Sequence, residues 1–169
     1  MSLLEMMSES EFFRSTPPVI LHLLEPIARE RDFAPGVQIF AEGLKHPEIH
    51  IVLHGHVRLV MLIPRRGGTP ILSVGSGEIL GWTPLLSDSE MTATAVAVDS
   101  VKTLAFPADK LRELCESNHE IGFHFMKRLA TAIAHRLTAT RLQLLDLYKE
   151  HTPATSATLT SIKPGDEEC

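Results

Sequence analysis

Residues 51–59, IVLHGHVRL, predict two short strands joined by a turn at Gly55. Valine, isoleucine and leucine favour strands, and a glycine between two such runs is typical of a tight connection. The same pattern continues over residues 33–106, where apolar runs such as VRLVMLI (57–63) and VKTLAF (101–106) alternate with glycine-containing turns. Short strands spaced at intervals of about 8–12 residues are typical of an antiparallel sandwich or jelly roll. The sequence therefore predicts a mainly β domain.

Helices are predicted on both sides of the strands. On the N-terminal side, Pro17 and Pro18 suit the first turn of a helix, because that turn does not need their missing N–H groups. Pro26 interrupts the helical pattern, so this helix is expected to be short or kinked and to end near Arg31. After Pro107 the apolar residues return to helical spacing, which predicts a short helix followed by a long one.

The long helix is expected to run from residue 119 to 148, with Asn118 as its N-terminal cap. Residues at alternate spacings of four and three lie along it: Ile133, Leu137, Thr140, Leu144 and Leu147. This spacing is typical of a coiled-coil seam, so the helix is predicted to pair with a second copy of the chain. The alternative is that the stripe belongs to an ordinary core. Leu142 and Leu145 lie off it and are available to pack against the strands.

The chain is predicted to hold one domain, residues 17–148, between a polar or amphipathic lead-in at 1–16 and a flexible tail at 151–169. Its net charge of −5 gives no sign of the basic surface that nucleic-acid-binding proteins usually carry. Its two cysteines do not make a disulfide framework, and neither a signal peptide nor a membrane-length apolar run is evident. We therefore expect a cytoplasmic protein without a membrane partner.

Three glycine-containing segments resemble a known family. They are Pro35-Gly36-x-x-Ile39-Phe40-x-Glu42-Gly43, Ile51-Val52-Leu53-x-Gly55-x-Val57-x-Leu59 and Gly77-Glu78-x-x-Gly81. Together with the order of helices and strands over residues 17–148, they resemble the cyclic-nucleotide-binding domain of the Crp–Fnr regulator family. The resemblance implies a β-roll, that is, a double-stranded β-helix jelly roll, with a long C-terminal dimerisation helix. It also implies a ligand-sensing regulatory function without catalysis and without a cofactor.

The resemblance places a phosphate-binding cassette at residues 77–93. In the family, the segment after Gly77-Glu78 forms a short helix whose N-terminal amides, together with an arginine, hold the cyclic phosphate, as suits a helix N-terminus. A glutamate after the second cassette glycine holds the ribose hydroxyl. In this chain Trp82 follows Gly81, and Met91 stands before Thr92-Ala93 where the arginine is expected. Both charged contacts are absent, so the chain is not expected to bind cyclic AMP as its relatives do.

The candidate ligand-binding residues come from this cassette and from the long helix. They are Gly77, Glu78, Gly81, Trp82, Met91, Thr92, Ala93, Thr140 and Arg141. The resemblance puts Thr140 at or near the position of an adenine contact. Arg141 either reaches the same pocket or pairs on the surface with Asp146 or Glu150, and Trp82 is either a wall of an apolar pocket or a plug in the core. The expected ligand is a small apolar molecule or an anion held by backbone amides.

Transcription factors of the family continue past the long helix into a winged helix-turn-helix, which reads the DNA major groove. Residues 149–169 are net acidic and show no pair of amphipathic helices, so direct DNA binding is not expected. The Gly81-Trp82 pair and the helix end at residues 136–148 resemble a subgroup of small stand-alone domains. The expected partners are a second copy of the chain, a small-molecule or anionic ligand, and a partner protein.

Two other functions are left open by the residues alone. One is a ligand-free dimeric adaptor. The other is a cupin-like metal-dependent enzyme, since cupins bind metal through histidines and a glutamate on a related jelly roll. The residues concerned are His46, His50, His54 and His56, with Glu42 and Glu48 nearby. The cupin spacing is not met, because no glutamate follows His56 before Glu78, so we expect neither a metal site nor an enzyme.

Overall fold

The computed structural model describes residues 1–151, with side chains to residue 148. The helices are α1 (Leu3–Glu9), α2 (Pro18–Leu24), α3 (Thr83–Leu86), α4 (Ala108–Ser117) and α5 (His119–His151), with 3-10 turns η1 (Glu11–Phe13) and η2 (Glu25–Ile27). The strands are β1 (Arg29–Phe33), β2 (Gln38–Phe40), β3 (Glu48–His54), β4 (Val57–Ile63), β5 (Gly67–Val74), β6 (Ile79–Leu80), β7 (Thr94–Ala97) and β8 (Val101–Pro107). From residue 152 on, the predicted tail lies outside the described residues.

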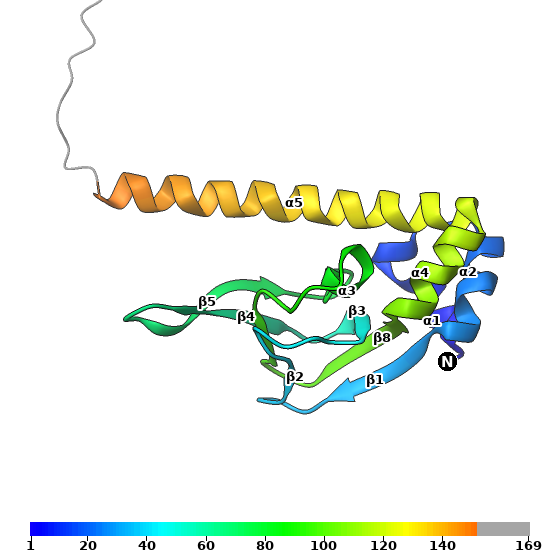
Figure 1. Cartoon of the computed structure of the whole chain (residues 1–169), viewed down its shortest axis with the longest axis horizontal. Coiled ribbons are helices and arrows are strands. Elements are labelled where there is room, and N and C mark those ends of the chain that lie inside the picture. The colour runs from blue at the N-terminus through cyan, green and yellow to red at the C-terminus, as the bar shows by residue number, and fades with distance from the viewer. Residues whose placement is uncertain (152–169) are drawn as a thin grey trace, which may run out of the picture. The chain divides into compact units, whose positions relative to one another are not determined.

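The chain separates into two compact units, Met1–Ile133 and Ala134–Cys169. The first unit contains two antiparallel sheets, in the orders β1-β8-β3-β6 and β2-β7-β4-β5 (Figure 1). From the second unit, the structure describes only the C-terminal part of α5. The predicted mainly β jelly roll with flanking helices and a long C-terminal helix is confirmed. No helix among the described residues is both long enough and apolar enough to cross a membrane.

Strands of both sheets contribute to an apolar cluster that we call the roll interior. Its buried members are Ile39, Phe40, Val52, Val57, Leu59, Val74, Leu80, Met91, Ala93, Ala95, Ala97 and Val101. Successive residues of a strand point to opposite faces, so β3 supplies Val52 to this cluster and Ile49 and Ile51 to the other face. The first sheet therefore has apolar side chains on both of its faces.

The helices cover that other face and form a second apolar cluster, the helix-side cluster. Figure 1 shows α1, α2 and α4 gathered at one end of the strands. Residues 1–16 contribute Met7, Phe12 and Phe13 to this cluster, which also holds Phe106 of β8 and Phe125 of α5. Phe125 is 2% exposed, and its ring centroid lies 5.6 Å from that of Phe12. The N-terminal lead-in is thus part of the core of the first unit.

The N-terminal boundary of the roll differs from the prediction. The helix expected to end near Arg31 ends at Leu24, and β1 begins at Arg29 after the single 3-10 turn η2. Pro26 lies in that turn and cannot donate the N–H that a continued helix needs. The segment Arg29–Phe33 carries four charged residues, so it lacks an apolar run, and it becomes a strand by pairing with β8 from Arg29↔Ala105 to Phe33↔Val101.

The C-terminal helix begins as predicted. The side-chain Oδ1 of Asn118 accepts hydrogen bonds from the backbone N–H groups of Glu120 (3.1 Å) and Ile121 (3.2 Å), which confirms the N-terminal cap. The helix ends at His151, three residues beyond the expected Tyr148. At its start, Ile121, Phe125 and Leu129 belong to the helix-side cluster, so the helix is anchored to the core of the first unit.

Candidate functional site

The turn that opens the cassette is held by hydrogen bonds. The carboxylate Oε2 of Glu78 accepts from the N–H of Gly75 at 2.7 Å, and its backbone carbonyl accepts from the N–H of Val52 at 2.9 Å. The N–H of Gly77 donates to the carbonyl of Val52 at 2.8 Å. Glu78 therefore shapes the turn between β5 and β6 and ties it to β3.

Both cassette glycines have left-handed backbone conformations, with φ of 82° at Gly77 and 74° at Gly81. A Cβ atom at Gly77 would lie 2.8 Å from the Cβ of Glu11, and one at Gly81 would lie 3.2 Å from the carbonyl oxygen of Glu48. Side chains rarely adopt these φ values, and these two positions also lack room for one. The turns of the cassette and its packing against η1 and β3 thus explain why Gly77 and Gly81 are glycines.

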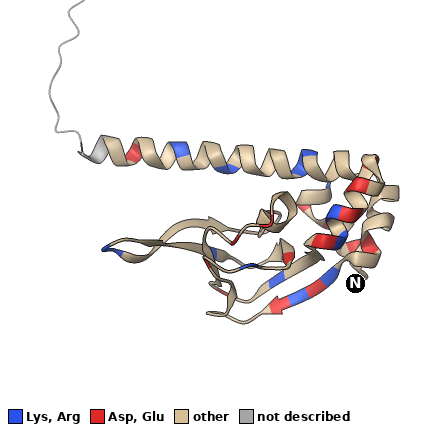
Figure 2. Cartoon of the chain, in the orientation of Figure 1, with Lys and Arg blue, Asp and Glu red and all other residues tan. Residues whose placement is uncertain are grey.

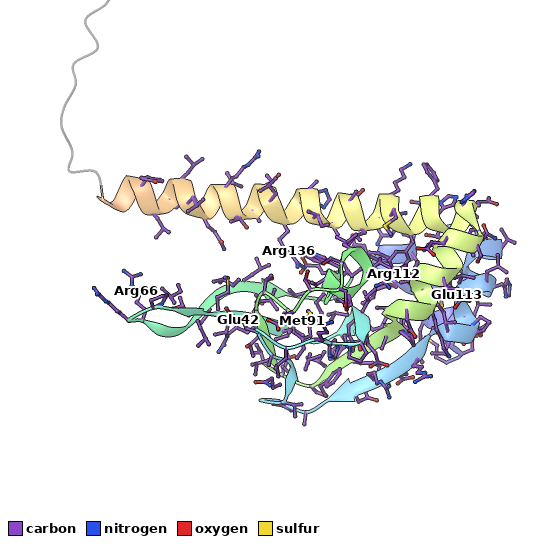
Figure 3. The ribbon with its side chains drawn as sticks, in the orientation of Figure 1. Glu42, Arg66, Met91, Arg112, Glu113 and Arg136 are labelled. Carbon is purple, nitrogen blue, oxygen red and sulfur yellow. The ribbon has the colours of Figure 1, made fainter. Side chains whose placement is uncertain are left out.

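Met91 is 5% exposed and belongs to the roll interior (labelled in Figure 3). Its N–H donates to the carbonyl of Leu44 at 2.9 Å, and its carbonyl accepts from the N–H of Gly43 at 2.8 Å. Ala93 is buried in the same cluster, whereas Thr92 between them is exposed. Two backbone hydrogen bonds therefore fix Met91 at the position of the expected arginine, and its side chain packs in an apolar cluster.

Trp82 is half-buried at the position before α3 and packs against the helix-side cluster. Met91 packs in the roll interior, so the two side chains that replace the expected charged contacts lie in different clusters. Helix α3 is held by Arg112, whose Nη2 donates to the carbonyl of Pro84. Figure 3 shows Arg112 extending from α4 toward α3. Nearby, Lys45 and Asp88 form an ion pair at 2.8 Å.

The two candidate residues on the long helix, Thr140 and Arg141, lie in the second unit and are exposed. The hydroxyl of Thr140 donates to the carbonyl of Arg136 at 2.9 Å, one turn earlier on the same helix. This hydrogen bond is local, so it neither requires nor excludes a ligand. The ligand contact expected of Thr140 and Arg141 therefore stays a prediction.

The four histidines separate into two places. Nε2 of His46 lies 2.9 Å from Nε2 of His50, and Nδ1 of His50 lies 3.1 Å from the hydroxyl of Thr103. His54 is exposed, and His56 pairs with Asp99 at 2.7 Å. Among the described residues, no three histidine, cysteine or acidic side chains form a group that could hold a metal ion.

The two glutamates near these histidines also have partners. Glu48 pairs with Arg31 at 2.8 Å, and the carboxylate of Glu42 accepts from the N–H of Leu62 at 2.8 Å. Arg31 and Thr103 were not among the sequence candidates, because their side chains reach Glu48 and His50 only when β1, β8 and β3 pair with one another. No local pattern in the sequence predicts this pairing.

Burial controls the protonation of the histidine pair. His50 is 1% exposed, and this burial, with a smaller contribution from His46, lowers the pKa of His50 to about 4. Burial also lowers the pKa of His46, against the opposing effect of Glu48. Both rings are therefore neutral at pH 7, and one proton lies between the two Nε2 atoms.

The lowered pKa of His50 predicts that the folded chain loses stability in mild acid. The unfolded chain binds a proton at His50 near pH 6.5, whereas the folded chain does so only near pH 4, so the contribution is complete above pH 6.5 and is lost as the pH falls. Between pH 7 and pH 5, the free energy of unfolding should fall by about 2 kcal/mol from this group. Urea unfolding at several pH values measures it. His50→Gln should flatten the slope, and His22→Gln, at an exposed position, should not.

A family model described as the cyclic nucleotide-binding domain matches residues 30–118. The chain belongs to this family. A CRP-like cAMP-activated global transcriptional regulator of Mycobacterium tuberculosis is 23% identical over 143 residues, which are 85% of this chain and 62% of that protein. The domain therefore spans about three fifths of the length of this curated relative.

Solved structures of cyclic nucleotide-binding proteins have a similar fold. The catabolite activator protein of Thermus thermophilus is 27% identical with a TM-score of 0.65, over 82% of this chain and 63% of that chain. A cyclic nucleotide-binding domain from Methylobacillus flagellatus has a TM-score of 0.74 at 21% identity, over 85% and 81% of the two chains, and shows the fold alone. The resemblance to the Crp–Fnr regulators, first drawn from three glycine segments, is confirmed.

Proposed function

We propose that the chain is a non-catalytic regulatory domain whose roll interior does not hold a cyclic nucleotide through the charged contacts of its family. The observation that supports this most directly is the burial of Met91 at the position of the expected arginine. Met91 packs there among apolar side chains, and the buried polar side chains His50 and Thr103, on the same faces of β3 and β8, bond to each other. A cyclic phosphate placed in the roll interior would lose its hydration without gaining a cation, which is costly. The ligand expected there is a small apolar molecule or an anion held by backbone amides.

The size of the effect follows from the missing contacts. A hydrogen bond to a charged group contributes about 1.5–3 kcal/mol, so the loss of two such contacts weakens binding by about two to four powers of ten. An affinity in the micromolar range becomes millimolar or weaker. Trp82 adds a second reason, because the residue at the sequence position of the expected glutamate carries no charge and packs against the helix-side cluster.

The proposed domain acts as a homodimer through α5. Leu137, Leu144 and Leu147 are each about half exposed in the single chain, at 49%, 51% and 55%. Their alternate spacing of seven and three residues matches a coiled-coil seam. A row of exposed leucines on a helix is costly in water, so pairing with a second copy supplies the burial that it lacks. The proposed output of the domain is contact with a partner protein.

Titration with cyclic nucleotides tests the proposal. The fluorescence of Trp82, the only tryptophan, reports on the cassette, and calorimetry gives the affinity. The wild type should bind cyclic AMP and cyclic GMP with dissociation constants of about 1 mM or weaker. Met91→Arg should bind cyclic AMP at least about tenfold more tightly, because it restores one charge-assisted contact. Met91→Leu is the matched control and should bind as weakly as the wild type. Micromolar binding by the wild type would refute the proposal.

A further inference from the structure

A groove of about 740 Å³ lies at the N-terminal end of α4, and we call it the basic groove. Its walls come from β1, from the loop before β3, from the cassette after α3, and from the first turns of α4. Its volume is that of a site for a small molecule. Part of the cassette lines it, but none of the nine candidate ligand-binding residues does, so it is a different site from the one predicted from the sequence.

Positive charge predominates in this groove. Its cations are Arg29, Arg31, Lys45, Lys110 and Arg112, from β1, the loop before β3, and α4. Its carboxylates are Glu48, Asp88 and Asp109. Figure 2 shows positive and negative residues alternating along β1. Because Arg29 and Arg31 are two positions apart on that strand, they lie on the same face, while the acidic residues of β1 lie on the other.

Most of these charges are already engaged within the chain. Arg31 pairs with Glu48 and Lys45 pairs with Asp88, both at 2.8 Å, and Arg112 donates to the carbonyl of Pro84. The carboxylate of Asp109 accepts from the N–H of Lys110 at 2.8 Å. The side chains of Arg29 and Lys110 have no such partner among the described residues, and both are exposed. Two cations therefore remain available at the two sides of the groove.

We propose that the basic groove binds a small anion that carries phosphate groups, with Arg29 and Lys110 forming the ion pairs to it. Arginine and lysine are the residues that proteins use for phosphate, the first through a planar fork of donors and the second as a point charge. The ring of His46 lines the groove and supplies a neutral polar group beside these cations. This proposal goes beyond the proposed function and does not depend on it, because the two sites share no ligand-binding residue.

An occupant of the groove would contact the cassette directly. Pro84, Ser87, Asp88 and Ser89 form one wall, and the ion pair of Asp88 with Lys45 joins that wall to the loop before β3. A phosphate competes with Asp88 for Lys45, so binding loosens or shifts this ion pair. Trp82 is two residues from Pro84, so its fluorescence is expected to change on binding.

The test titrates the full chain with inorganic pyrophosphate at low ionic strength, with Trp82 fluorescence and calorimetry as readouts. The wild type should bind saturably. Arg29→Gln with Lys110→Gln should weaken binding by about two- to thirtyfold, because it removes two exposed ion pairs. Arg58→Gln with Arg66→Gln is the matched control, since it removes two exposed cations on and beside the β4–β5 hairpin (Arg66 is labelled in Figure 3), and it should not change the affinity. Arg29→Lys with Lys110→Arg keeps both charges and should keep binding.

A second measurement locates the ligand without a variant. The imidazole signals of His46 should shift during the pyrophosphate titration, and those of His22, on the exposed face of α2, should not. Absence of saturable binding by the wild type would overturn the proposal. Equal weakening by the two double variants would also overturn it, because binding would then follow net charge alone. Saturable binding with no shift at His46 would place the anion elsewhere and would have the same consequence.

Discussion

Phe125→Ala is expected to lower the free energy of unfolding by about 3–5 kcal/mol, the range for removing a buried phenylalanine. The ring is 2% exposed and has three aromatic neighbours from distant parts of the chain. Its centroid lies 5.6 Å from that of Phe12, 6.4 Å from that of Phe13 and 6.3 Å from that of Phe106. Removing it leaves a cavity where α5, η1 and β8 meet, and such a cavity closes only in part.

Urea unfolding at one fixed protein concentration measures this change, because the proposed dimer would make stability depend on concentration. Phe123→Ala is the matched control: it lies two residues earlier on the same helix and is 62% exposed. Its ring centroid lies 5.5 Å from that of His124 and 5.7 Å from the ammonium of Lys127, so its loss should cost about 1 kcal/mol or less. A cost for Phe125→Ala as small as that for Phe123→Ala would show that the helix-side cluster does not stabilise the fold.

Leu137→Asp combined with Leu144→Asp should convert the proposed dimer into monomer. Two buried leucines in each protomer contribute several kcal/mol, and an aspartate at a seam position must also lose its hydration. The dissociation constant should therefore rise by at least about three powers of ten. Light scattering at micromolar protein should give the mass of a single chain. Ile133, the first seam residue, is left unchanged because it packs against the helix-side cluster.

The control for the seam is Leu142→Asp combined with Leu145→Asp. These leucines are exposed to a similar degree, at 58% and 56%, but they lie off the seam by their spacing. The control protein should remain dimeric. If both double variants are monomeric, the helix pairs through a wider apolar surface than the seam. If both are dimeric, the contact between copies lies elsewhere.

The strands were predictable because their signals are local. Short apolar runs with glycines at the turns predict a roll whatever the order of pairing, and Asn118 predicts a cap from its side chain alone. The start of β1 was not predictable in the same way. Its residues Arg29–Phe33 are charged on both faces, and only the ladder with β8, about 70 positions later in the chain, makes them a strand.

In the candidate site, too, single residues were predictable from the sequence, whereas contacts between distant segments were not. The absence of the two charged cassette contacts is evident from single positions, Trp82 and Met91. Trp82 and Met91 pack in different clusters. Which cluster each side chain enters depends on the direction of the chain after Gly81, and no local sequence pattern predicts that direction. The basic groove draws its charges from residues between Arg29 and Arg112, and their net excess of cations is hidden in a chain with a net charge of −5.

The contact between Phe12 and Phe125 constrains the order in which the chain acquires its structure during synthesis. Phe12 leaves the ribosome more than one hundred residues before Phe125, and until then the helix-side face of the first sheet has no complete cover. The β4–β5 hairpin, with its short connection, forms from neighbouring residues and does not have to wait. Until Phe125 has been made, the apolar side chains Ile49, Ile51, Leu104 and Phe106 on this face lack the cover that α5 provides. The first turns of α5 complete the cover of this face. The same helix carries the proposed dimer seam, so the fold is completed and the seam is made at nearly the same stage of synthesis.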